Sequence, residues 1–294
     1  MADAPDILMY GKTSEAPACP VCGSARFRAM GRLESRSVLR CRRCGVGYAW
    51  PRPSLAELTD LYCLRYFGEN PHYAMSQEEY LRQILANHIA KVSWPLKGRR
   101  VLDFGCGEGV FLTGLKEFGA DVYGIESNDA RRNRACTRAR VPVWKTLDGV
   151  PPGIRFHLVI MNEVIEHLLY PTQTLRDLGS LLDVGGGIYV STPNFGGLKA
   201  RLRGLQWENY TDLTHLCYFN WSSLLCAARM AGFHIVRRLR TRVKFPAMGL
   251  LRQAANRAVS VLGYDSGLKT YLTFWDARYE SGAASDGQPP CGAD

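Results

Sequence analysis

Four cysteines near the start of the chain are spaced like the ligands of a metal ion. Cys19-Pro-Val-Cys22 and Cys41-Arg-Arg-Cys44 are separated by residues 23–40, and each pair is followed by a glycine. Two Cys-x-x-Cys pairs with a spacer of this length are typical of a four-thiolate zinc site, and the glycines permit the tight turns it needs. Because four thiolates leave no open coordination position, the sequence predicts a structural zinc in a ribbon over residues 18–50.

A glycine-rich stretch further along has the position and spacing of a cofactor loop. Asp103-Phe-Gly105-Cys106-Gly107-Glu-Gly109 follows a short strand-like run, 100–102, and precedes a helix-like segment, 110–118. Strand, glycine turn and helix in this order are typical of the first crossover of an α/β sheet, where ligands lie beyond the carboxyl ends of the strands. The third glycine comes one residue earlier than in the dinucleotide pattern Gly-x-Gly-x-x-Gly. Our cofactor-binding candidates here are Asp103, Gly105, Cys106, Gly107 and Gly109.

Two carboxylates indicate which cofactor this loop binds. Asp103 ends the strand before the turn, where a carboxylate repels a pyrophosphate and attracts an ammonium group. The next strand, 121–126, ends in Glu126, which is placed to bind a ribose diol. A ribose and an amino-acid ammonium group without a phosphate describe S-adenosylmethionine.

Three stretches resemble class I S-adenosylmethionine-dependent methyltransferases: 101–109, 124–126 and Asn162-Glu-Val-Ile-Glu-His167. The resemblance extends over about residues 97–279 and points to the branch that methylates ubiquinone precursors and sugars. It implies an α/β fold with a doubly wound, Rossmann-like, seven-stranded sheet. It also implies a polar group near Asp148 that caps the adenine amine, and it places Asn162 at the border of the acceptor half of the pocket. Asp148 and Asn162 are therefore further cofactor-binding candidates.

Two histidines are candidates for the base that removes a proton from an acceptor hydroxyl. His167 closes the motif after the fourth strand, and His215 lies in a polar and aromatic connection, 207–219, that we expect to rim the acceptor pocket. Histidine titrates near neutrality and suits this role, although either residue can instead be structural. We favour His215. No cluster of metal-binding acids stands out in this half of the sequence, which argues against a magnesium-assisted mechanism.

The remaining segments complete the expected domain organisation. Ser54 is a candidate N-cap for a helix over residues 55–62. The expected segments are a flexible leader at 1–17, a helical lid or linker at 51–96, the methyltransferase domain at 97–280 with an amphipathic helix at 247–262, and a disordered tail at 281–294.

Composition narrows the location and the partners. The chain lacks an apolar run long enough to span a membrane, and its acidic start does not resemble a signal peptide. We therefore expect a cytoplasmic protein, in which ten cysteines stay reduced. The net charge of +10 and seven arginines between residues 26 and 43 are compatible with RNA binding, but a solvated ribbon face is the simpler explanation and the one we favour.

Three functions are consistent with these observations. The favoured one is O-methylation of a small-molecule or sugar hydroxyl in secondary or cell-surface metabolism. The second is methylation of ribosomal or transfer RNA, with the basic ribbon as the RNA contact. The third is an inactive scaffold that binds the cofactor without turnover, and the intact glycine loop with both carboxylates argues against it.

Overall fold

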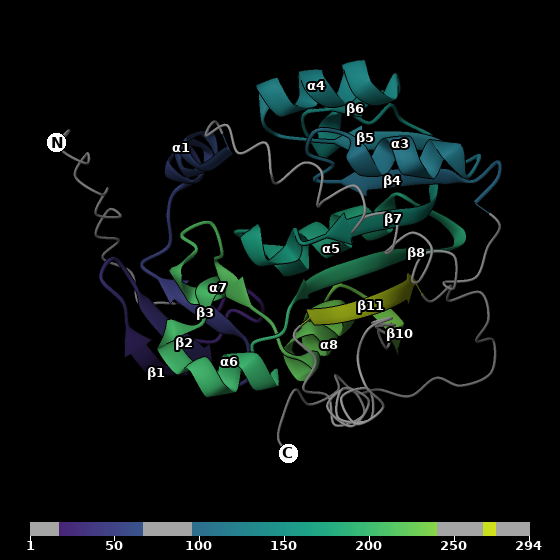
Figure 1. Ribbon diagram of the computed structural model, residues 1–294. Coiled ribbons are helices and arrows are strands. Elements are labelled where there is room, and N and C mark those ends of the chain that lie inside the picture. The colour runs from purple at the N-terminus through teal and green to yellow at the C-terminus, as the bar shows by residue number, and fades with distance from the viewer. Residues whose placement is uncertain (1–17, 67–95, 240–266, 275–294) are drawn as a thin grey trace, which may run out of the picture.

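The computed structural model describes residues 18–66, 96–239 and 267–274 (Figure 1). The expected leader, the greater part of the lid, the 247–262 helix and the C-terminal tail lie outside these residues. The described strands form a four-stranded sheet in the order β1-β2-β3-β9 and a seven-stranded sheet in the order β10-β11-β8-β7-β4-β5-β6.

The larger sheet has the doubly wound order that the resemblance implies. β4 pairs in parallel with β5 on one side and β7 on the other, and β7 pairs in parallel with β8. β11 is antiparallel to both of its neighbours, β8 and β10. The fold class is therefore confirmed. The strands are β4 (Arg100–Phe104), β5 (Asp121–Ile125), β6 (Val143–Trp144), β7 (Phe156–Asn162), β8 (Leu182–Pro193), β10 (Phe233–Arg238) and β11 (Gly267–Phe274).

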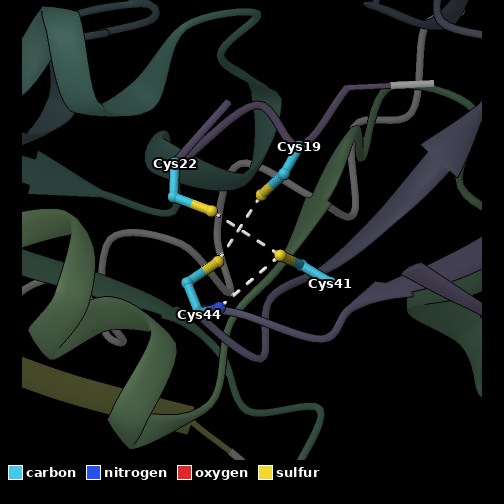
Figure 2. Close-up of side chains that lie close together, drawn as sticks. All are labelled: Cys19, Cys22, Cys41 and Cys44. Carbon is cyan, nitrogen blue, oxygen red and sulfur yellow. Dashed lines mark hydrogen bonds between the residues drawn. The ribbon is translucent and has the colours of Figure 1, made fainter. Parts of the chain in front are cut away.

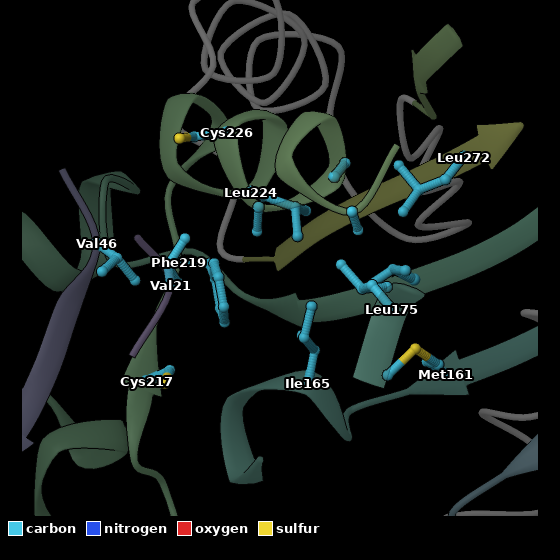
Figure 3. Packing of buried hydrophobic residues seen from close by; sticks show 14 of the residues in the cluster. Val21, Val46, Met161, Ile165, Leu175, Cys217, Phe219, Leu224, Cys226 and Leu272 are labelled. Carbon is cyan, nitrogen blue, oxygen red and sulfur yellow. The ribbon is translucent and has the colours of Figure 1, made fainter. Parts of the chain in front are cut away.

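Helices cover both faces of this sheet because successive strand residues point to opposite sides. Leu158 and Ile160 of β7 belong to one apolar cluster with α3 (Val110–Glu117) and α4 (Asp129–Ala139). Val159 and Met161 belong to a second cluster with α5 (Pro171–Ser180) and α8 (Trp221–Met230) (Figure 3). A strand buried on both faces carries a continuous apolar run, as β7 does over residues 158–161.

Gly185, Gly186 and Gly187 lie inside a strand, because α5 ends at Ser180 and β8 already begins at Leu182. A Cβ on Gly187 would lie 2.5 Å from the Tyr271 hydroxyl oxygen on β11, so glycine permits a close passage of two strands. At the other edge of the sheet, β6 contains only Val143–Trp144.

The smaller sheet contains the predicted ribbon and one strand from far along the chain. β1 (Phe27–Arg32), β2 (Ser37–Cys41) and β3 (Gly47–Trp50) form an antiparallel meander. β9 (Cys217–Tyr218) pairs with β3. Several buried residues of the ribbon, among them Val21 and Val46, lie in the same apolar cluster as Phe219 and Leu224 (Figure 3). The ribbon and the larger sheet therefore share a core.

Short helices connect these layers. α1 (Leu55–Tyr66) begins at the predicted cap, where Ser54 Oγ accepts the Glu57 amide at 3.2 Å and Glu57 Oε2 accepts the Ser54 amide at 2.7 Å. α6 (Leu198–Arg203) and α7 (Glu208–Thr211) lie beside the ribbon (Figure 1). Among the described residues, no helix has both the length and the apolar character that a membrane span requires.

Candidate functional site

A cleft of about 2240 Å³ lies beyond the carboxyl ends of β4, β5 and β7. One wall consists of the glycine loop, the segment after β5 and the segment after β7. The opposite wall includes Trp50 of the ribbon, Leu55 and Leu58 of α1, and residues of the 208–215 segment. The position at the carboxyl ends of parallel strands is the one that ligands occupy in sheets of this kind.

The glycine loop has the backbone conformation that its residue types predict. Gly105, Gly107 and Gly109 have φ values of 79°, 57° and 79°, which residues other than glycine rarely adopt. Gly105 and Gly107 line the cleft. Gly109 instead permits close helix packing, because a Cβ there would lie 2.9 Å from Ala135 Cα on α4.

Glu126 and Cys106 shape this loop from below. One carboxylate oxygen of Glu126 accepts the Gly107 amide and the other accepts the Asn128 amide, each at 2.9 Å. Cys106 donates its amide to the carbonyl of Ile125 at 3.0 Å, and its buried thiol belongs to the apolar cluster under α3. Both residues line the cleft, so Glu126 presents a carboxylate and Cys106 presents backbone to a ligand.

Asp103 is a buried acid at the floor of the cleft, with only 4% of its surface exposed. Burial, and then the negative charge of Glu126, raise the pKa of its carboxyl group to about 7. A cationic ligand would return this carboxyl to its charged form. S-adenosylmethionine carries a sulfonium and an ammonium group, so its charge complements this acidic floor.

We expect Asp103→Asn to weaken cofactor binding about tenfold to hundredfold, because a charge-assisted hydrogen bond contributes about 1.5–3 kcal/mol. In the wild type, cofactor affinity should fall as the pH is lowered through 7, with a limiting slope of about tenfold per pH unit. Calorimetric titration between pH 6 and 8 measures both effects. Glu117→Gln, on the exposed end of α3, is the matched control and should change neither. Equal affinities in Asp103→Asn and wild type would contradict the assignment.

The raised pKa of Asp103 also makes the stability of the cofactor-free protein depend on pH. Because the folded-state pKa of Asp103 lies above the ordinary value of 3.8, its protonated form is the one that the cofactor-free fold favours. The stability that this preference contributes is present below about pH 4 and is lost as the pH rises toward 7.

Asp148 and Asn162 also lie in the cleft wall. Asp148 belongs to an exposed 3-10 turn, Leu147–Gly149. Asn162 ends β7, with its Oδ1 2.9 Å from Ser191 Oγ. The same hydroxyl oxygen lies 2.6 Å from Glu163 Oε1. Their roles toward a cofactor stay predictions.

Glu163 is a cleft residue that the sequence did not single out. Its φ of 55° places a non-glycine residue in the left-handed region directly after β7. Such strained residues gather at functional sites. The residue type gives no sign of this conformation, because glutamate rarely adopts it.

Both predicted histidines line the cleft. One of them, His215, forms a dyad with Asp212. His215 Nε2 lies 3.2 Å from Asp212 Oδ2, and His167 Nδ1 lies 2.9 Å from the carbonyl oxygen of Thr214. The two imidazole rings meet edge to face with centroids 4.6 Å apart. Asp212 Oδ1 in turn accepts the amide and the hydroxyl of Thr214, at 3.0 Å and 2.7 Å. The spacing Asp-x-x-His within 212–215 is the signal by which the sequence could have shown Asp212.

These contacts determine which ring nitrogens can accept a proton. A backbone carbonyl only accepts, so His167 Nδ1 carries a hydrogen and the lone pair of the neutral ring is on Nε2. His215 directs Nε2 to a carboxylate, so the neutral ring carries its lone pair on Nδ1. A histidine oriented by a carboxylate on one nitrogen is the arrangement of a general base.

Glu166 adds a buried carboxyl group beside the two rings. It is 1% exposed, and burial followed by the charge of Glu163 raises its pKa well above the ordinary value. One potential ligand atom from each of Glu166, His167 and His215 lies within 4.8 Å of the others. The sequence analysis did not bring these three side chains together, although the group contains one acid and is not the acid cluster of a magnesium-assisted mechanism. Two imidazoles and a carboxylate suit a divalent transition ion.

The aromatic side chains of the 207–219 connection do not rim the cleft as expected. Trp207, Tyr210 and Tyr218 are at least 95% buried in an apolar cluster with Val38 of the ribbon. The polar residues of this connection, among them Asp212 and His215, face the cleft instead. The aromatics therefore anchor the connection, and the polar residues are available to a ligand.

The four predicted zinc ligands converge (Figure 2). All four sulfurs are buried and lie within 4.8 Å of one another, with Cys19–Cys44 at 3.5 Å and Cys22–Cys41 at 3.6 Å. Zinc–sulfur bonds of about 2.3 Å in a tetrahedron imply sulfur separations of about 3.8 Å. Gly23 and Gly45 have φ values of 69° and 77° at the knuckle turns, as their position predicts. The donor set therefore fits a structural zinc.

The sheet order, the glycine loop and the acidic cleft floor together define a class I S-adenosylmethionine-dependent methyltransferase fold. Residues 74–238 match the family model described as a methyltransferase domain, and the chain belongs to this family.

The chain is also similar to curated proteins over part of their length. A ubiquinone biosynthesis O-methyltransferase from Azorhizobium caulinodans is 30% identical over 125 residues, which is 39% of this chain and 49% of the relative. A mitochondrial protein of the same description from Arabidopsis thaliana is 25% identical over 199 residues, which is 62% of each chain. The chain thus spans 49–62% of the length of these relatives. A S-adenosylmethionine-dependent methyltransferase from Archaeoglobus fulgidus superposes with a TM-score of 0.48 at 20% identity, covering 67% of this chain and 94% of that one.

Proposed function

We propose that this protein transfers the methyl group of S-adenosylmethionine to a hydroxyl oxygen of a small-molecule acceptor. The observation that carries the proposal is the Asp212–His215 dyad, whose 3.2 Å contact lies in the cleft that also contains the glycine loop. An oriented imidazole is needed when the acceptor is a hydroxyl, which must lose its proton. The names of the curated relatives, ubiquinone biosynthesis O-methyltransferases, support oxygen as the acceptor atom.

In this proposal the residues divide into two groups. Asp103 and Glu126 bind the ammonium group and the ribose of the cofactor, which supplies an electrophilic methyl carbon. The carbon–sulfur bond breaks with its electron pair on sulfur as the acceptor oxygen forms the new carbon–oxygen bond. His215 Nδ1 takes the hydroxyl proton, and Asp212 stabilises the resulting imidazolium. Positioning of the two substrates contributes much of the rate.

The proposed acceptor is a small molecule that carries a hydroxyl group. Sugars of secondary or cell-surface metabolism are one group of candidates. RNA is the alternative. Arg26, Arg28 and Arg43 of the ribbon are exposed, which supports a basic contact surface. Arg36 and Arg40 instead bond to backbone carbonyls within the protein, so part of the arginine content has a structural use.

We also propose one structural zinc bound by Cys19, Cys22, Cys41 and Cys44, and a cytoplasmic location. The converging sulfurs support the first. Cys106, Cys136, Cys217 and Cys226 form no disulfide bonds, which is consistent with a reducing compartment.

The test is methyl transfer from methyl-labelled cofactor by the purified protein. Catechols and other phenols, nucleotide sugars and total RNA are offered separately, and the labelled product is identified by mass spectrometry. The proposal expects an O-methyl product from a small-molecule pool. Label in RNA alone would favour the alternative, and cofactor binding without transfer to any pool would favour an inactive scaffold.

A further inference from the structure

We propose that the ribbon positions the acceptor-side dyad, and that Arg36 is the positioning residue that links the two. This inference rests on the proposed function, because it assigns a purpose to the ribbon within the same site. Arg36 precedes β2 and lies outside the set of described residues that line the cleft. It therefore acts through the backbone of the dyad rather than on a ligand.

Arg36 is bonded to nearly the whole segment that carries the dyad. Its side chain is buried, with 3% exposed, and its two terminal nitrogens donate to four backbone carbonyls. The acceptors are Tyr210 at 2.5 Å, Asp212, Leu213 at 3.2 Å and His215 at 3.0 Å. A planar guanidinium can bond several carbonyls at once, and a lysine cannot reproduce this fork. Two of the four carbonyls belong to the dyad residues themselves.

The ribbon also holds the chain directly after the dyad. The amide of Ala49 on β3 donates to the carbonyl of Leu216 at 3.0 Å, and Tyr48 pairs with Cys217 of β9. Gly47 permits this pairing, because a Cβ there would lie 3.1 Å from Tyr218 Cβ. The dyad thus lies between two attachments to the ribbon, one through Arg36 and one through β3.

The 3-10 turn after β7 contacts the same segment. The Leu216 amide donates to the carbonyl of Glu166 at 2.8 Å, and His167 Nδ1 contacts the carbonyl of Thr214. The dyad segment is therefore hydrogen-bonded both to the ribbon and to the residues that follow β7, which also line the cleft. A shift of about 1 Å in a reacting group can lower a rate about a hundredfold. Without Arg36 the imidazole of His215 would lose this placement.

Arg36→Ala is the test, with Arg36→Lys as the conservative variant. The exposed ribbon residue Arg32, changed to Ala, is the matched control. We expect Arg36→Ala to lower kcat about tenfold to hundredfold, while the Kd and KM for S-adenosylmethionine stay within twofold of wild type. Arg36→Lys should have a kcat between those of Arg36→Ala and wild type. Added methylguanidinium should raise the kcat of Arg36→Ala but not that of the other variants or of wild type. Arg32→Ala should behave as wild type.

Hydrogen exchange tests the same inference without an acceptor. Peptides covering residues 208–218 should exchange faster in Arg36→Ala, whereas peptides covering 100–126 should be unchanged. If wild-type protein methylates nothing, the proposed function fails, and the exchange result still decides the role of Arg36. Unchanged exchange over 208–218, or an unchanged kcat, would overturn the positioning role. Equal losses of kcat, zinc content and cofactor affinity would also overturn it, because they indicate general unfolding.

Discussion

Replacement of His215 by alanine should lower kcat for methyl transfer about a hundredfold or more, with cofactor affinity unchanged. The proposed cofactor contacts are the loop after β4 and the end of β5, which do not include this residue. Asp212→Asn should have a similar effect, because it removes the charge that orients and stabilises the imidazole at 3.2 Å. Steady-state kinetics at saturating substrates and calorimetric titration with the cofactor measure the two quantities.

His234→Ala, on an exposed position of β10, is the control for loss of a histidine and should be neutral. His167→Ala should lower kcat less than His215→Ala, and part of its effect should come through stability. In wild type, kcat should fall as the pH is lowered through the histidine range. A fall that persists unchanged in His215→Ala would reject His215 and assign the base to His167. If neither substitution matters, positioning alone supports catalysis.

Because Glu166, His167 and His215 could together bind a metal ion, the kinetic experiments should also be done after treatment with a chelator and after addition of metal ions. Dialysis against a chelator, at a strength that leaves one zinc per chain, should not change kcat if His215 acts as the base without a metal ion. Loss of activity that Mn²⁺, Mg²⁺ or Zn²⁺ restores would instead show that these three side chains bind an ion during turnover.

Loss of the zinc site should have the largest effect on stability. Cys41→Ser should abolish the copurifying zinc, and the ribbon should then lose its folded structure, so that its cooperative unfolding transition disappears. The binding free energy of structural zinc in small modules is about 10–16 kcal/mol, comparable to the whole stability of a typical domain. Because Cys41 lies in the same apolar cluster as Leu224 of α8, the damage should extend into the larger sheet. Native mass spectrometry and thermal melting monitored by circular dichroism measure both outcomes.

Cys136→Ser is the matched control, since Cys136 is a free, half-buried thiol on α4, which packs on the opposite face of the larger sheet from α8. It should keep one zinc and the wild-type melting temperature. Undiminished zinc in Cys41→Ser would contradict the four-thiolate assignment.

The shared core changes how the ribbon is understood. A domain attached by a linker would contribute little to the site of its neighbour. Here β3 pairs with β9, and Thr172 Oγ1 at the start of α5 donates to the carbonyl of Val21 at 2.9 Å. The ribbon therefore forms a wall of the cleft and stabilises the connection that carries His215.

The features that the sequence by itself determined are those with local causes. The left-handed φ values of Gly105 and Gly107 follow from residue type, because glycine has no Cβ to oppose them. The knuckles around Cys19 and Cys41 follow from ligand spacing, and the start of α1 follows from the reciprocal bonds of Ser54 and Glu57. Each of these signals lies within a few residues along the chain.

The features that only the tertiary structure decided join residues far apart in the chain. Arg36 bonds the carbonyl of Asp212 across 176 positions, and no periodicity or spacing encodes such a pair. The grouping of Glu166 with His215, and the pairing of β9 with the ribbon, have the same character. These contacts form because buried polar groups must find partners wherever packing places them, and the packing depends on the whole fold. The chemistry could thus be predicted from local motifs, whereas the device that orients it required the assembled core.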